Sequence, residues 1–176
     1  MQKLHIGCGD IYFKGWINID LESNKADLKW NMLNPLPYEY DSIDFIYNEH
    51  FIEHLTVEEG LRVMQNFYKI LKQGGVLRIA TIDLNYIVHK YNFFWKNQDW
   101  IKTHKYQWIK TKAEMMNICF HEWGHKYLYN EEELKRRLEE AGFKKIKSVK
   151  FNKSGFEELK NRETRKDSKL ILEAIK

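Results

Sequence analysis

The stretch LHIGCG at residues 4–9, followed by INID at residues 17–20, decides the fold class of this chain. A short apolar run leads directly into Gly7 and Gly9, and glycines at this point let the backbone turn sharply and approach a ligand closely. Asp20 ends the second run, where a carboxylate can accept hydrogen bonds from both hydroxyls of a ribose. A glycine pair alone is equally typical of an ordinary turn, so the prediction of a nucleoside site depends on Asp20.

The glycine loop does not match a dinucleotide-binding loop. Tyr12 stands where the GxGxxG fingerprint needs a third glycine, and the loop to Trp16 is too short for a helix that could bind a pyrophosphate. S-adenosylmethionine carries no phosphate. Its methionine part needs a backbone that approaches it closely, its ribose needs an acid and its adenine needs an amide edge. This sequence supplies all three.

The order of elements predicts an α/β fold, because short apolar runs alternate with helical patterns. We expect an open, mostly parallel sheet with helices on both faces and an antiparallel C-terminal edge strand. Expected strands cover residues 3–6, 16–19, 27–30, 43–47, 76–81, 145–151 and 170–175, the last two joined by a charged, mobile segment. Thr56 and Asn130 each precede a helical pattern that a glycine ends, at Gly74–Gly75 and at Gly142.

Length and composition favour one globular domain over residues 1–176, with a helical, aromatic-rich insertion at about 84–129. The N-terminus lacks the pattern of a signal peptide and no stretch is apolar enough to span a membrane, so we expect a cytoplasmic protein with no membrane partner. Two cysteines, Cys8 and Cys119, fit a reducing compartment. Residues 144–176 carry 11 basic and 5 acidic side chains, which suits phosphate-rich partners or a plain solvated surface.

Five ordered motifs together resemble the small class I S-adenosylmethionine-dependent methyltransferases of the type 11 group, over nearly the whole length. They are LHIGCGD (4–10), GWINIDL (15–21), NMLNPLPYEYDSIDFIYNEHFIEHL (31–55), LKQGGVLRIATID (71–83) and HKYLYNEEELKRRLEEAGF (125–143). The resemblance implies a Rossmann-like fold and S-adenosylmethionine as cofactor. It implies that Gly7, Cys8 and Gly9 bind the methionine end, Asp20 and Leu21 the ribose, Asn31 and Met32 the adenine, and Asn48 and Glu49 the sulfonium side.

Three features depart from the family pattern. His5 stands where many relatives have an acid for the amino group of the ligand, and Asn31 stands where an Asp usually meets the adenine amine. The first crossover helix is absent or vestigial. Each of the two substitutions replaces a charge with a neutral hydrogen-bonding group, which weakens a contact without abolishing it.

The motif NEHFIEHL at residues 48–55 supplies the candidate catalytic residues. Methyl transfer requires alignment and the removal of a proton, so one base is enough. His50 and His54 are the candidate bases, and an ordinary surface or capping role fits each of them equally. Helical spacing lets His50 share a face with Glu53 or with His54.

The segment HEWGH at residues 121–125 matches the HExxH pattern of zinc hydrolases. Such a site needs a sustained helix and a third ligand, whereas Gly124 weakens the helix and Asn130 begins another. We therefore predict no metal site. By the resemblance, this stretch covers the acceptor pocket, with His121, His125 and Tyr127 as substrate contacts.

Aromatic and lysine residues interleave in YNFFWKNQDWIKTHKYQWIK at residues 91–110. This pattern suits base stacking, a lid or an ordinary amphipathic core helix. The leading hypothesis is methyl transfer to an oxygen or nitrogen atom of a small molecule or sugar. The alternatives are a non-catalytic nucleic-acid-binding module on the same fold and a zinc hydrolase that uses HEWGH.

Overall fold

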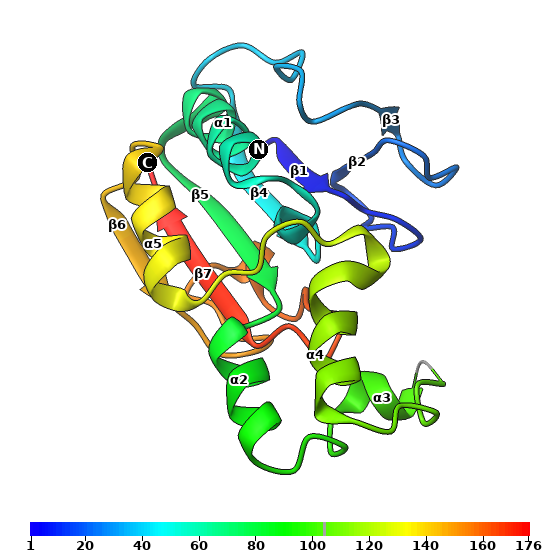
Figure 1. Ribbon diagram of the computed structural model, residues 1–176. Helices are drawn as coiled ribbons and strands as arrows, with labels where there is room; N and C mark the ends of the chain where they lie inside the picture. The colour runs from blue at the N-terminus through cyan, green and yellow to red at the C-terminus, as the bar shows by residue number, and fades with distance from the viewer. Residues whose placement is uncertain (104) are drawn as a thin grey trace.

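The computed structural model describes residues 1–103 and 105–176, and its centre is a seven-stranded sheet (Figure 1). The strands lie in the order β3-β2-β1-β4-β5-β7-β6. The first five are parallel, whereas β7 runs antiparallel to both β5 and β6. This confirms the predicted Rossmann-like sheet with its antiparallel C-terminal edge. The strands are β1 (Lys3–Ile6), β2 (Ile17–Asp20), β3 (Leu28–Lys29), β4 (Ile43–Glu49), β5 (Leu71–Thr81), β6 (Lys145–Ser148) and β7 (Leu170–Ile175).

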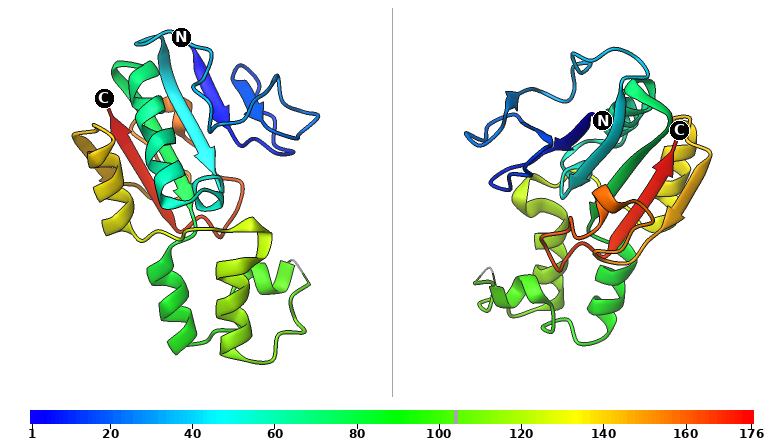
Figure 2. Two further views of the ribbon diagram at one scale, coloured as in Figure 1. Left: turned by 45° about the horizontal axis from the view of Figure 1, so that its top comes forward. Right: turned by 180° about the vertical axis from the view of Figure 1, so that it is seen from behind.

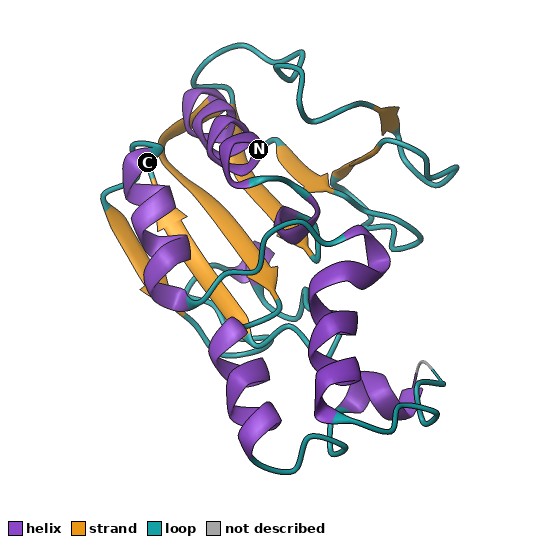
Figure 3. Ribbon diagram, viewed as in Figure 1, coloured by secondary structure: helices purple, strands orange, loops and turns teal. Residues whose placement is uncertain are grey.

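Flanking helices cover the sheet, as Figure 3 shows. Helices α1 (Val57–Ile70) and α5 (Glu131–Glu140) pack on one face and form the main hydrophobic core with it. The opposite face carries the short 3-10 helix η3 (Glu157–Leu159) and the chain around it, seen from behind in Figure 2. Phe13, Trp16 and Leu159 form a second buried cluster there.

Helix α1 begins as its capping box predicts, because the Thr56 side chain accepts a hydrogen bond from the Glu59 amide and the Glu59 carboxylate accepts one from the Thr56 amide. Its predicted end at Gly74–Gly75 is wrong. The helix stops at Ile70 and β5 starts at once, since Leu71 pairs with Ile43 of β4. The two glycines lie inside β5, where they exchange backbone hydrogen bonds with Lys176.

The loop between β1 and β2 contains no helix, as predicted, and a buried polar group shapes it. Nδ1 of His5 donates to Oδ1 of Asn18 at 3.0 Å, and the same oxygen accepts the Phe13 amide at 2.9 Å. The His5 ring also stacks on the Phe13 ring at 4.1 Å. His5 is 3% exposed, so it fixes the loop from beneath.

Residues 84–129 form α2 (Leu84–Asn92), α3 (Asp99–Thr103), α4 (Lys112–His121) and the 3-10 helix η2 (Glu122–Gly124), beyond the carboxyl ends of the parallel strands (Figure 1). They enclose a separate hydrophobic cluster that includes Trp100, Ile101 and Met115. Among the residues that the structure describes, no helix is both long enough and apolar enough to cross a membrane.

Candidate active site

A cavity of about 1210 Å³ lies where β1, β2, β4 and β5 end. Open parallel sheets bind their ligands at this edge. One part of its wall is formed by the glycine loop, the end of β2 and residues 30–33. The other part is formed by residues 50, 51, 54 and 55, by residues of the 84–129 segment and by residues 164–167. Because one ligand typically fills about 300–1,000 Å³, the cavity has room for a cofactor and an acceptor together.

The glycine loop presents Gly7 and Gly9 to the cavity. Both have a positive φ, +64° and +50°, which favours glycine. A Cβ at Gly7 would lie 2.9 Å from Cδ2 of Phe51, whereas the space around a Cβ at Gly9 is open to 4 Å. The backbone at Gly9 is therefore the open part of the loop, on which a ligand can lie.

Asp20 lines the cavity at the end of β2. Its carboxylate accepts backbone amide hydrogen bonds from Gly9, Glu22 and Ser23, each at 2.9 Å. Burial alone raises the pKa of Asp20, but these amides outweigh burial and hold the pKa below its ordinary value. Asp20 is thus an ionised acceptor that also ties the glycine loop to the strand, and Leu21 lies beside it in the cavity wall.

Asn31 and Met32 lie in the same wall, as the resemblance implied for an adenine pocket. Oδ1 of Asn31 accepts the amide of Leu33 at 2.9 Å, which leaves its side-chain nitrogen for other partners. Trp30 lines this part as well. The amide of Asn31 and the apolar surface of Met32 and Trp30 therefore lie in the same part of the cavity wall as Asp20.

Cys8 and Asn48 were also predicted to contact the cofactor, but the structure places neither side chain in the cavity wall. Cys8 is 3% exposed and Asn48 is fully buried. Burial raises the pKa of the Cys8 thiol to about 11, so this thiol stays protonated. Both residues support the site from beneath it.

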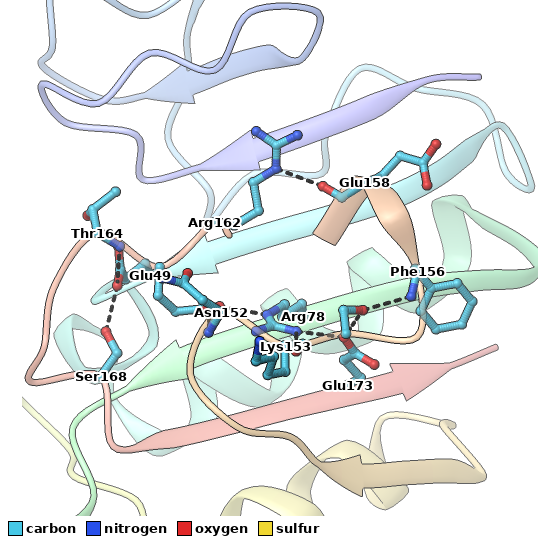
Figure 4. A network of polar contacts seen from close by, with 12 residues as sticks. Glu49, Arg78, Asn152, Lys153, Phe156, Glu158, Arg162, Thr164, Ser168 and Glu173 are labelled. Atoms are coloured by element: carbon cyan, nitrogen blue, oxygen red, sulfur yellow. Dashed lines mark hydrogen bonds and ion pairs between the residues drawn. The ribbon is translucent and has the colours of Figure 1, made fainter. Parts of the chain in front are cut away.

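Glu49 is committed to contacts within the chain (Figure 4). Its carboxylate accepts hydrogen bonds from the amide and hydroxyl of Thr164, the amide of Arg165 and the hydroxyl of Ser168. The sequence suggested a direct sulfonium contact, yet Glu49 is outside the cavity wall and instead holds residues 164–167 in that wall. The segment expected to be mobile is therefore fastened to β4.

A second group of contacts fastens the same segment to β5 (Figure 4). The buried Arg78 guanidinium lies 2.6 Å from carboxylate oxygens of both Glu163 and Glu173, and it donates to the Lys153 carbonyl at 2.8 Å. All three charged side chains are inaccessible to solvent. Arg78 lies far from Glu163 and Glu173 in the sequence, so the periodicity of a single segment could not reveal this network.

His50 and His54 both line the cavity, and His50 is paired with Glu53. Nδ1 of His50 lies 3.0 Å from Oε1 of the fully buried Glu53. His50 has a φ of +51°, a strained conformation for a residue with a Cβ. Burial raises the pKa of Glu53, but the hydrogen bond and charge of His50 outweigh it and leave this pKa below its ordinary value. Glu53 was not among the predicted site residues, although its spacing from His50 signalled the pair.

The HEWGH segment does not form a hydrolase helix. Helix α4 ends at His121, and Trp123 has a φ of +59° within η2. The alternative of a zinc hydrolase built on an HExxH helix is therefore wrong. His121 is exposed and Tyr127 points to Glu133, and neither lines the cavity, whereas His125 does.

Three aromatic residues of 84–129 face the cavity. Tyr86, Trp100 and Trp123 line the cavity, and Trp123 lies edge-on to Trp100 at 5.4 Å between ring centroids. His104, in the 91–110 stretch, lies outside the described residues. Trp100 is the one aromatic residue of the described part of the 91–110 stretch in this wall, whereas Phe93, Phe94 and Trp108 are exposed. The sequence did not identify Tyr86, Trp100 and Trp123 as site residues.

The chain matches a family model described as a methyltransferase domain over residues 8–148. It belongs to this methyltransferase family. The protein is a methyltransferase-family member with a Rossmann-like fold. No curated protein matches the sequence significantly.

Solved structures of S-adenosylmethionine-dependent methyltransferases share the fold of this family member. The protein from Archaeoglobus fulgidus has a TM-score of 0.61 at 18% identity, covering 99% of this chain and 86% of that one. The structure from Thermotoga maritima has a TM-score of 0.60 at 19% identity and covers 99% of this chain and 82% of that one. The structure from Mesorhizobium loti has a TM-score of 0.59 at 13% identity, with coverages of 99% and 90%. Identities this low show a shared fold and do not identify the methyl acceptor.

Proposed function

We propose that this methyltransferase transfers a methyl group to an oxygen or nitrogen atom of a small molecule or sugar, with residues 84–129 as the acceptor-binding insertion of a single domain. One observation carries the proposal: a single cavity is lined both by Gly9 and Asp20 and by Trp100 and Trp123, with His50 in its wall. A methyl donor and an aromatic-lined acceptor site therefore share one space.

The residues at the glycine loop fit S-adenosylmethionine. The open space over Gly9 accepts the methionine part, and the ionised Asp20 accepts the ribose hydroxyls. Asn31 and Met32 provide the edge and surface for adenine. When bound, S-adenosylmethionine supplies an electrophilic methyl group with a neutral leaving group, so the protein needs only to align the acceptor and remove its proton.

His50 is the proposed base. Its Nδ1 lies 3.0 Å from Oε1 of Glu53, a contact that favours the tautomer with the proton on Nδ1 and leaves Nε2 to take a proton. Within the described part of the chain, Nε2 is buried and has no hydrogen-bond partner, so the ring has to turn toward the cavity to take a proton. His54, also in the cavity wall, is the second candidate.

Calorimetry with S-adenosylhomocysteine tests the cofactor half of this proposal. We expect binding to the wild type and an affinity about tenfold or more lower for Asp20→Asn, which keeps the shape but loses a charged acceptor. Asp10→Asn is the matched control, because the Asp10 side chain is 91% exposed and lies outside the cavity wall. Absence of binding at millimolar ligand would refute the proposal.

Release of S-adenosylhomocysteine in the presence of phenols, sugars and amines tests the acceptor half. We expect at least one compound of these classes to raise the release in the wild type and not in Asp20→Asn. If only a nucleic acid or a protein stimulated it, the small-molecule assignment would be wrong.

A further inference from the structure

Three metal-ligating side chains meet in one place at the cavity. Glu53, His54 and His125 each offer one ligand atom, and these atoms all lie within 4.8 Å of one another. His54 and His125 belong to the cavity wall, and their rings are 5.1 Å apart, edge to face. Two imidazoles and one carboxylate are thus gathered from two distant segments of the chain.

The backbone brings the two segments together. The Glu53 carbonyl accepts hydrogen bonds from the amides of Lys126 at 2.8 Å and Tyr127 at 3.2 Å. Gly124 lies beside His54 with a φ of +78°, a backbone conformation that favours glycine, and a Cβ there would make an ordinary contact with Nδ1 of His54 at 3.5 Å. The cluster is therefore set by main-chain pairing, so its members keep their places without a bound ion.

The His125 ring is oriented by a contact outside the cluster, and the His54 ring faces the cavity. Nδ1 of His125 donates to the Cys119 carbonyl at 2.8 Å, which leaves Nε2 as its ligand atom. Metal-binding histidines are typically held this way, because the outer hydrogen bond fixes the tautomer. His54 is partly exposed to the cavity, so its ring has room to turn.

Glu53 has a single polar partner for its buried carboxylate. It is fully buried, and in the described chain its oxygens form no hydrogen bond beyond the contact of Oε1 with Nδ1 of His50 at 3.0 Å. A buried charge without compensation is costly, and a metal ion is one of the usual compensations. Oε2 is free to face such an ion while Oε1 keeps His50.

We propose that Glu53, His54 and His125 bind one divalent transition-metal ion, with coordination positions left open toward the cavity. Two histidines and one carboxylate are a typical ligand set for catalytic zinc and for non-haem iron, whereas magnesium and calcium prefer oxygen ligands. Bonds of about 2.0–2.2 Å place neighbouring ligand atoms of a tetrahedral site about 3.4 Å apart, so the side chains, whose ligand atoms lie within 4.8 Å of one another, need to close by up to about 1.4 Å.

The role of this ion rests on the methyltransferase function proposed above. A hydroxyl group of the acceptor bound at an open position would lose its proton more readily, because a divalent ion stabilises the alkoxide or phenolate. The proton would pass to His50, and the oxygen would form its bond to the methyl carbon as the carbon–sulfur bond breaks and its electron pair stays on sulfur. The site therefore favours oxygen acceptors over nitrogen acceptors.

Titration of the purified protein with Zn²⁺, and with Co²⁺ followed by visible absorption, tests the site. We expect one equivalent to bind the wild type, and an affinity more than about tenfold lower for Glu53→Gln, His54→Ala and His125→Ala. His121→Ala is the matched control, since it removes the other histidine of HEWGH outside the cluster and should retain the metal. Circular dichroism checks the fold, and the partly exposed His54 gives a variant that leaves the core intact.

The outcomes separate this proposal from the proposed function. No stoichiometric binding to the wild type, or equal loss in His121→Ala and His125→Ala, overturns the metal site. Metal binding without S-adenosylhomocysteine binding leaves the site standing and rejects the methyltransferase function proposed for the cavity. Binding of S-adenosylhomocysteine without metal binding overturns the metal site and leaves the proposed methyltransferase function standing.

Discussion

Nδ1 of His50 lies 3.0 Å from Oε1 of Glu53, and Glu53 is sealed from solvent. The pair resembles the base and orienting carboxylate of many enzymes, in which the carboxylate fixes the imidazole that moves the proton. His50 is thus held in one orientation with Nε2 as its second nitrogen. This arrangement makes the role of His50 testable by kinetics.

Replacement of His50 by Ala should lower kcat by about 10²–10⁴-fold with the acceptor found by screening, because a positioned base is lost. The affinity for S-adenosylhomocysteine should change little, since the ribose and methionine contacts lie elsewhere. Steady-state kinetics and calorimetry measure both. His89→Ala is the control, because His89 is exposed and outside the cavity wall. Equal kcat in the two variants would remove His50 from the mechanism.

Gly7→Ala should destabilise the protein by about 1–3 kcal/mol, because alanine is strained at a φ of +64° and its Cβ would contact Phe51 at 2.9 Å. The displaced loop should also bind S-adenosylhomocysteine more weakly. Gly15→Ala has the same backbone problem, at a φ of +79°, in open space. Urea denaturation and calorimetry should therefore show a smaller loss for Gly15→Ala and unchanged binding. The steric argument fails if both variants behave alike.

Glu49→Gln should loosen residues 164–168, because the neutral amide accepts hydrogen bonds more weakly than the carboxylate that now binds Thr164, Arg165 and Ser168. We expect trypsin to cleave after Arg165 or Lys166 about tenfold faster, as local opening becomes easier. Glu58→Gln, at an exposed position on α1, should leave the rate unchanged. An unchanged rate in Glu49→Gln would show that other contacts hold the segment.

Arg78→Met should cost about 3–5 kcal/mol in the free energy of unfolding, because Glu163 would remain buried without its guanidinium partner and Glu173 would keep only the Lys147 ammonium at 3.8 Å. Chemical denaturation measures this loss. Arg136→Met removes a guanidinium whose ion pairs are half exposed, and it should cost much less. Similar losses for the two variants would contradict the role of burial.

Acidification should destabilise the protein through His5. Burial lowers the pKa of His5 to about 4, against the opposing effect of its hydrogen bond to Asn18. Between pH 6.5 and 4 the unfolded state then binds more protons than the native state. The free energy of unfolding therefore decreases by up to about 3 kcal/mol as the pH is lowered through this range. Urea denaturation at pH 7 and pH 4.5 should show a smaller fall for His5→Gln. Equal falls in both proteins would exclude His5 as the cause.

The sequence by itself determined the fold class and supplied candidate residues for the cofactor half of the site. The turn at Gly7 and Gly9, the acid at Asp20 and the capping box at Thr56 are local features, because neighbouring residues alone set backbone conformation, strand ends and helix starts. They sufficed to predict the sheet, and the structure places Gly9 and Asp20 together in the cavity wall. The end of α1 was misjudged because pairing of Leu71 with β4 overrides a local glycine signal.

Only the tertiary structure decided which distant groups meet. Glu49 faces Thr164, Arg78 faces Glu163 and Glu173, and His125 joins Glu53 and His54. Such contacts follow from strand order and from how loops return over the sheet edge, and periodicity within one segment carries no information about them. The composition of residues 84–129 predicted helices, but their packing decided that Trp100 and Trp123 line the cavity.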